Sequence, residues 1–477
     1  MNVRAGIVTV VGEISDRERE RKMGVSRRSF LGGAAFVAVA GCTTAGKNTV
    51  AAPSVSSVPE KKAADKPSDP YKGTRGVPLK VGSPCLQSAA STSMGVSWAV
   101  SGLSKGVVEY ADNPQFRNSR IVKSGGLALV PIDVSTLQVR LTGLKPSTRY
   151  YYRTITTPFT DYSNIYDAKL GEPIVGDIHS FTTLGESNRG CFAMISDTHG
   201  RWKSYEMHAS HLKANPPGLL LWNGDATNTT QDKATAVSVF LNPPIPSADF
   251  AAEVPMSFVC GNHDYRGSWI SRINEVLLPR LPSERMSEFW DLKWNFAERL
   301  GDMAIIGMDT GEDKPDAHPR WFGLANFEPY RKLQAKWLEQ AFARPEIASA
   351  KFKVVFCHIP LYAAPGHPDY AHDGAKVDPT DFAHWSRECF DLWNPIMEKA
   401  GVQLVVAGHT HRYRHDLPSP GRRWHQVVGG GHELGVVRGR PDASRFPTVI
   451  EGSVRNGQLV VTVHDVFKKR IVETFAV

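Results

Sequence analysis

Six short apolar runs after residue 190 end on residues of the kinds that bind metal ions. The run over residues 303–308 ends at Asp309 and brings no clear ligand set, so Asp309 is interpreted as a structural turn residue. The other five runs deliver seven candidate ligands: Asp197, His199, Asp225, Asn262, His358, His409 and His411. Carboxylate and amide oxygens combined with imidazoles suit two divalent or trivalent ions, of iron, manganese or zinc.

The apolar runs are predicted to be strands of an α/β fold, where loops at the carboxyl ends of strands turn side chains into a shared crevice. Asp197 and His199 are two positions apart, so a turn rather than a strand must bring both inward. Gly224 allows a close approach of the backbone just before Asp225. A carboxylate at that point could bridge two cations through its two oxygens.

The motifs behind these runs resemble those of the calcineurin-like metallophosphoesterases, whose signature is DxH, GDxxN, GNHD, a strand-end His and GHxH. All five blocks occur in that order between residues 197 and 411. The resemblance implies a four-layer α/β/β/α sandwich with a dinuclear centre. It implies that the first metal is held by Asp197, His199, Asp225 and His411. It implies that the second metal, bridged through Asp225, is held by Asp225, Asn262, His358 and His409.

The same resemblance implies roles for residues around the metals. His263 would face the substrate with Asp264 orienting its ring, and an imidazolium there can protonate the leaving alkoxide or offset phosphoryl charge. Asn228 fills the last place of the GDxxN block and is expected to bond phosphate or order a loop, without binding metal. Asn262 is also expected to contact the substrate. His367, in the Pro- and Gly-rich loop after His358, is expected either to touch the substrate or to be a solvated loop residue.

A dinuclear centre of this kind would activate water. Two cations about 3.5–4 Å apart would bridge a water molecule and lower its pKa enough to supply hydroxide near neutral pH. The hydroxide would attack phosphorus in line, without a covalent enzyme intermediate, in a small phosphate monoester or diester. The alternatives are a nucleotide or phospholipid-head-group phosphodiesterase and, from another class, a cell-surface binding protein whose catalytic domain has decayed. No ligand is missing from the motifs, which favours hydrolysis.

A nearer resemblance is to the purple acid phosphatases, which pair a fibronectin-like N-terminal domain with this catalytic domain. The stretch over residues 140–153 and the segment His-Ile-Pro-Leu-Tyr at residues 358–362 are similar to theirs. The metal motifs depart from that family, which has GDxxY and DxG. Asn228 stands where the tyrosine would be, and His199 takes over the missing ligand position. We therefore expect no tyrosinate-to-iron colour.

Other polar residues have plainer interpretations. His432, in a glycine-rich segment after the last motif, would line the pocket or stabilise a turn. Surface positions are expected for a further set of histidines: His208, His211, His384 and His415.

Two folded domains are predicted along the chain. Residues 76–185 alternate short apolar and polar runs, with strands expected at 94–100, 106–110, 136–141, 150–156 and 179–183. Tyr150 resembles the tyrosine corner of fibronectin type III domains, and a structural spacer is favoured over a substrate-binding role. Residues 188–477 alternate apolar strands with candidate helices at 203–214, 330–343 and 382–399, which indicates βαβ units. The last fifty residues return to strands.

The N-terminus indicates export. Residues 1–42 combine the pair Arg27-Arg28, a short apolar run and the ending Val-Ala-Gly-Cys42, which resembles a twin-arginine signal with a lipoprotein cleavage site. The run is too short for a comfortable transmembrane helix. Residues 43–75 are expected to be a flexible linker, and translation starts at Met1 or Met23. The expected location is the periplasm or cell envelope, with membrane contact only through lipidated Cys42.

Composition excludes some other classes. The net charge of +8 falls to +5 without residues 1–41, which hold seven basic and four acidic residues, so no nucleic-acid footprint is present. Five cysteines follow Cys42 without a CxxC pair, and we interpret them as structural, with one disulfide possible and no sulfur ligand to metal. The oligomeric state is not determined by the sequence.

Overall fold

The computed structural model describes residues 78–124, 134–188, 190–280, 284, 291–363 and 383–477. The chain divides into residues 1–67, which fall outside these ranges, and the compact unit Ser68–Val477. The expected signal over residues 1–42, the linker over 43–75 and His367 therefore lie outside the described residues. Within the described ranges, no helix has the length and apolar character needed to cross a membrane.

The N-terminal part is the expected β-sandwich. One layer holds β1 (Cys85–Gln87), β2 (Ser93–Ala99) and β5 (Thr136–Thr142). The facing layer holds β3 (Ser104–Ala111), β4 (Arg120–Lys123), β6 (Arg149–Asp161), β7 (Lys169–Leu170), β8 (Ile174–Val175) and β9 (His179–Thr182). The backbone N–H of Lys145 donates to the hydroxyl of Tyr150 at 3.0 Å, which confirms the predicted tyrosine corner.

Two further sheets carry the rest of the chain. The first contains β10 (Phe192–Ile195), β11 (Leu219–Asn223) and β12 (Met256–Val259) in parallel, with β21 (Thr448–Arg455), β22 (Gln458–Asp465) and β23 (Arg470–Ala476) added antiparallel. The second has the order β13 (Phe296–Leu300), β14 (Met303–Met308), β15 (Phe352–Cys357), β16 (Leu404–Ala407), β18 (His425–Val428) and β17 (Arg414–Asp416). A small hairpin joins β19 (Val436–Val437) and β20 (Arg440–Pro441).

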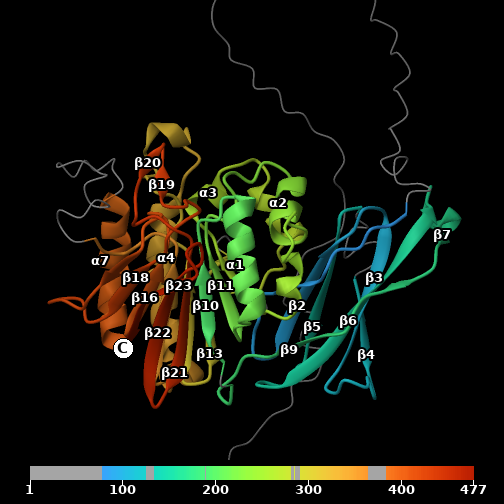
Figure 1. Ribbon diagram of the computed structural model, residues 1–477, viewed down its shortest axis with the longest axis horizontal. Coiled ribbons are helices and arrows are strands. Elements are labelled where there is room, and N and C mark those ends of the chain that lie inside the picture. Colours follow the sequence, from blue (N-terminus) through green and yellow to red (C-terminus); the bar gives the residue numbers. More distant parts are fainter. Residues whose placement is uncertain (1–77, 125–133, 189, 281–283, 285–290, 364–382) are drawn as a thin grey trace, which may run out of the picture. The chain divides into compact units, whose positions relative to one another are not determined.

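Helices cover the outer face of each sheet (Figure 1). Apolar side chains of α1 (Trp202–Ala214) and α2 (Lys233–Phe240) share one core with β10 and β11. Those of α4 (Phe327–Ala343) and α7 (Ala383–Ala400) share another core with β14, β15 and β16. A third core lies between the sheets, where the rings of Phe192 and Phe356 meet edge to face at 5.1 Å. The predicted α/β/β/α layering is confirmed.

Short helical segments fill the connections. Among the described residues, two are α-helical, α3 (Asn262–Tyr265) and α5 (Pro345–Ala348). Four are 3-10 turns: η2 (Ile165–Asp167), η3 (Ala248–Ala252), η4 (Ile270–Glu275) and η5 (Pro319–Trp321).

The β-sandwich and the catalytic sheet are continuous. Gln87 of β1 pairs in parallel with Met256 of β12, so that β1, β2 and β5 extend the first sheet to nine strands. The buried guanidinium of Arg280 donates to the carbonyl of Ala89 at 2.6 Å and pairs with Glu298 at 2.7 Å. The sandwich is thus integrated into the α/β fold through a shared sheet.

All five cysteines of the described chain are free, and all except Cys191 are buried. The possible disulfide is therefore not formed among them.

Candidate metal centre

The loops that carry the expected ligands have unusual backbone conformations. Five of the seven ligands have left-handed φ angles, between +47° and +70°: Asp197, His199, Asp225, His409 and His411. A non-glycine residue in this region costs about 1–2 kcal/mol. Strain of this kind persists where the surrounding structure enforces it, and it gathers at functional sites. The concentration of strain on these residues marks the ends of β10, β11 and β16 as the site.

Two glycines make room for the ligands. A Cβ atom on Gly224 would lie 2.5 Å from Nδ1 of His358, and one on Gly408 would lie 2.6 Å from Oδ2 of Asp197. Neither position can carry a side chain without displacing an expected ligand.

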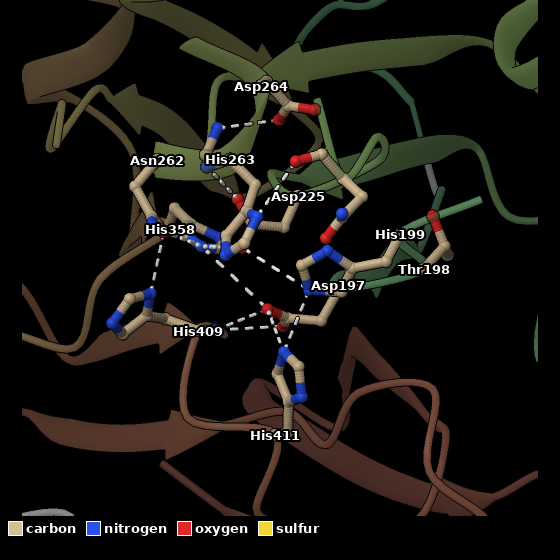
Figure 2. A network of polar contacts seen from close by, with 12 residues as sticks. Asp197, Thr198, His199, Asp225, Asn262, His263, Asp264, His358, His409 and His411 are labelled. Atoms are coloured by element: carbon tan, nitrogen blue, oxygen red, sulfur yellow. Dashed lines mark hydrogen bonds and ion pairs between the residues drawn. The ribbon is translucent and has the colours of Figure 1, made fainter. Parts of the chain in front are cut away.

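The first group of ligands meets between the ends of β10, β11 and β16 (Figure 2). Nε2 of His199 and Nε2 of His411 are 3.0 Å apart. Oδ1 of Asp197 lies 3.4 Å from Nε2 of His411. Oδ2 of Asp225 lies 3.6 Å from Nε2 of His199. The structure therefore brings together the four side chains expected around the first metal.

The second group adjoins the first through Asp225. Oδ2 of this carboxylate is also 3.2 Å from Nε2 of His358. Oδ1 of Asn262 lies 3.1 Å from the same nitrogen and 2.9 Å from Nδ1 of His409. Oδ1 of Asp225 is occupied, because it accepts the backbone N–H of His263 at 2.8 Å. One oxygen, Oδ2, thus faces both groups, whereas the sequence suggested a bridge through two oxygens.

The donor set fits a pair of cations. Nδ1 of His199 is buried without a hydrogen-bond partner among the described residues. The ring nitrogens of His199 and His411 converge at a distance where two lone pairs would repel unless a proton or a cation lay between them. Imidazoles, carboxylates and an amide oxygen at such spacing suit ions of the iron, manganese or zinc kind.

The carboxylates and imidazoles of the site shift one another's pKa values strongly. Burial favours the neutral form of His358, but Asp225 and Asp197 outweigh it and raise its pKa to about 9. Burial likewise opposes charge on His411, but Asp197 and Glu433 raise its pKa to about 10. Burial would raise the pKa of Asp225, yet the His358 and His199 imidazoles hold it well below its usual range. Because the protons on His358 and His411 must leave when metal binds, metal affinity should rise with pH.

The surroundings of His263 differ from the expected arrangement. Its Nε2 receives a hydrogen bond from Nη1 of Arg266 at 2.9 Å, and its Nδ1 lies 3.0 Å from the carbonyl oxygen of Asn228. Arginine can only donate, so Nε2 accepts and Nδ1–H donates, which is the neutral tautomer. Asn228 thus orients the ring with its backbone, the task expected of Asp264.

Asp264 instead connects two ligand loops. Its carboxylate accepts the backbone N–H of Gly261 at 3.0 Å and that of Thr227 at 2.9 Å. Those neighbours precede Asn262 and follow Asp225. Asp264 is therefore placed to fix the spacing of these two ligands rather than to touch the ring of His263.

Sequence reasoning missed two charged residues at the site. Oε1 of Glu433 lies 2.8 Å from Nδ1 of His411 and 3.3 Å from Nη1 of Arg445, so it orients the ring of a ligand. Arg266 is held by Glu312 through two contacts of 3.1 Å. Glu433 follows shortly after the end of β18 at Val428. Its position after a strand end was the sequence feature that could have identified it as a site residue.

The remaining candidate residues differ in whether they lie at the candidate metal centre. The ring of His432 lies 5.1 Å from that of His199 and 5.0 Å from that of His411, so it lines the metal centre. Asp309 accepts hydrogen bonds from Tyr265 and Tyr330 and has a structural role, as expected. His208 is fully buried, so its expected surface position was wrong.

Comparison with known proteins decides the family. Residues 191–413 match the calcineurin-like phosphoesterase family, and residues 84–183 match the purple acid phosphatase N-terminal domain. The chain contains a calcineurin-like metallophosphoesterase domain preceded by a purple acid phosphatase N-terminal domain. The metallophosphoesterase match contains all seven expected ligands.

Individual relatives agree with this metallophosphoesterase assignment. Purple acid phosphatase 15 of Arabidopsis thaliana is 24% identical over 306 residues, covering 58% of this chain; the chain spans about half (48%) of that relative's length. Purple acid phosphatase PPD1 from yellow lupin (Lupinus luteus) superposes with a TM-score of 0.59 at 13% identity, over 83% of this chain and 74% of that one. The structure of PhoD gives a TM-score of 0.50 at 13% identity, over 82% and 91%. These two structural likenesses show the fold.

Proposed function

We propose that this metallophosphoesterase hydrolyses small phosphate monoesters or diesters with two bound metal ions. The observation that carries the proposal is the position of Oδ2 of Asp225, which lies 3.6 Å from a ligand nitrogen of the first group and 3.2 Å from one of the second. A single carboxylate oxygen shared by two sets of imidazoles is an arrangement that can bridge a pair of cations.

When bound, two such cations would activate a water molecule and neutralise charge at phosphorus. The chain itself supplies the positioning. Asp225, held by the N–H of His263, sits between the two ligand groups. Glu433 orients His411, and Asp264 holds the loops that carry Asn262 and Asp225.

His263 and Arg266 would handle the substrate. Arg266 is anchored by Glu312 and Asp313, and its guanidinium reaches the half-buried ring of His263. The guanidinium of Arg266, anchored at this point, would bind a phosphoryl oxygen of the substrate. His263 can donate a proton to a leaving alkoxide only after its hydrogen bonds rearrange, because its Nε2 is an acceptor in this geometry.

The test combines metal analysis with a substrate panel. The full chain would be analysed for bound metal and assayed with nitrophenyl phosphate and bis(nitrophenyl) phosphate, with Mn, Fe or Zn added. We expect metal-dependent hydrolysis of at least one ester. A protein that binds no metal and hydrolyses neither ester would overturn the proposal in favour of a decayed binding protein. A visible absorption band lost on reduction would contradict the absence of a tyrosinate ligand.

We also propose that the chain is exported and lipid-anchored through Cys42. The support is the Arg27-Arg28 pair followed by the apolar run that ends at Cys42. Replacement of both arginines by lysine should leave the protein in the cytoplasm, as measured by cell fractionation. Unchanged export would contradict the twin-arginine route.

A further inference from the structure

A second group of metal-binding side chains lies away from the dinuclear centre. It joins His211 of α1, Glu451 of β21 and His464 of β22. Each offers one ligand atom, and the three atoms lie within 4.8 Å of one another. None of these residues belongs to the motifs that form the catalytic centre.

The carboxylate of Glu451 serves both imidazoles. Its Oε1 lies 2.9 Å from Nε2 of His211, and its Oε2 lies 3.3 Å from Nε2 of His464. The two rings are 4.7 Å apart between centroids. Ligand atoms bound to zinc at about 2.0–2.1 Å in a tetrahedron lie about 3.3 Å apart, and the two contacts of Glu451 are close to this spacing.

The strands fix two of the three ligands on one face. Val449 pairs with His464 and Glu451 pairs with Thr462, which makes Glu451 and His464 diagonal neighbours across the antiparallel pair. His211 reaches them from the last turn of the helix that covers this face. The three side chains are each partly buried, with exposed fractions of 17%, 26% and 19%.

The cluster borders a cavity of about 570 Å³ between α1 and the β22–β23 region. His211 and His464 line this cavity. A zinc ion with three protein ligands keeps a fourth position for water or a small anion, and the cavity gives access to it.

The cluster is separate from the catalytic pair. Glu451 pairs with Ala193, four residues before Asp197 along β10. At a rise of about 3.3 Å per residue, the two sites are roughly 13 Å apart along the strand.

We propose that His211, Glu451 and His464 bind a zinc ion, separate from the two catalytic metals. The ion ties the C-terminal turn of α1 to β21 and β22. Because α1 starts directly after the loop of Asp197 and His199, this third ion stabilises the helix that leads away from the catalytic ligands.

The test is a difference in zinc content. The full chain and its Glu451→Gln and His464→Gln variants would be loaded with zinc, dialysed and analysed by mass spectrometry of the metal. We expect each variant to bind one zinc fewer than the wild type, while phosphoesterase activity is retained. This difference does not depend on how many ions the catalytic centre holds. Equal zinc content in folded variants and wild type would overturn the proposal.

The matched control is His415→Gln. His415 contacts Glu473 through Nδ1 and His425 through Nε2, so its two partners lie on opposite edges of the ring and cannot share one ion with it. This variant should keep the wild-type zinc content. If the site variants fail to fold, wild-type crystals soaked in zinc chloride decide the question at the zinc absorption edge. An anomalous peak between His211 and His464 supports the site, and its absence overturns it.

Discussion

At the residue scale, the two carboxylate oxygens of Asp225 have different roles in the candidate metal centre. One oxygen of Asp225 faces the ligand groups while the other holds the backbone of His263. Both carboxylate oxygens of Asp225 are therefore in use. The consequences of changing one side chain can therefore be stated sharply.

Asp225→Asn should remove both catalytic metals together. A neutral amide offers one weakly donating oxygen and one N–H₂ group, so it cannot hold two cations at one point. Metal analysis should show a loss of two equivalents relative to wild type, with activity near background. The control is Asp302→Asn, a change of the same kind at an exposed position. A loss of one equivalent or none would contradict the bridging role.

His263→Ala should leave the metals bound and lower kcat. Removal of a proton donor, or of a group that offsets developing charge, costs a factor on the order of 10²–10⁴. The ring contacts Arg266 and the carbonyl of Asn228, so its loss does not remove a ligand expected of the metals. Metal content measured in parallel shows whether the centre is intact. An unchanged kcat would exclude His263 from the reaction.

At the element scale, paired strands are held together by ionic interactions as well as by the packing of their apolar faces. Glu109 of β3 accepts from Ser119 at 2.7 Å and from Nε of Arg153, on the partner strand β6, at 2.8 Å. The hydrogen bond from Ser119, and then the interaction with Arg153, hold the pKa of Glu109 below its usual value.

The Glu109 interactions predict a pH-dependent stability. A carboxylate whose folded pKa is depressed stabilises the fold above its unfolded pKa, near 4.5, and this contribution is lost as pH falls through the folded value. Glu109→Gln should lower the free energy of unfolding by about 1 kcal/mol at pH 7. The difference from wild type should shrink below pH 4.5 in urea unfolding. Glu172→Gln, at an exposed position, should show no such difference. A difference independent of pH would contradict the ionic interpretation.

At the scale of the whole molecule, the β-sandwich and the metallophosphoesterase domain share one sheet and a hydrogen bond from the buried Arg280. Arg280 is bonded to Ala89 of the sandwich, to Ser257 of β12 at 2.7 Å and to Glu298 of β13. We therefore expect the two domains to unfold together.

Arg280→Met in the full chain should lower the free energy of unfolding by roughly 3–5 kcal/mol, because it leaves Glu298 with a buried and unpaired charge. Urea unfolding followed by sandwich proteolysis and by loss of activity should give one shared midpoint, shifted down for both probes. The double variant Arg280→Met/Glu298→Gln should recover much of the loss, since no lone charge remains. Separate midpoints for the two probes would contradict the coupling.

Much of the catalytic centre was predictable from sequence, because each ligand follows an apolar strand directly. Parallel strands place their carboxyl ends on one edge, so the motifs after β10, β11 and β12 meet at one sheet and those after β15 and β16 at the other. The packing of the two sheets then brings both sets together. The strands of the sandwich and the tyrosine corner followed from period-two patterns and turn residues. The contacts of His263 were not predictable, since Arg266 reaches its ring only through the turn of α3 and the anchor at Glu312.

The sequence by itself determined which side chains are the expected ligands and on which strand ends they stand, since strand periodicity and motif order are local properties. Only the tertiary structure decided three other features: the single shared oxygen of Asp225, the union of sandwich and catalytic sheet through β1 and β12, and the meeting of His211 with Glu451 and His464. These depend on side-chain rotation and on contacts between segments up to about 250 residues apart. Tertiary packing decides these contacts, and no local pattern in the chain encodes them.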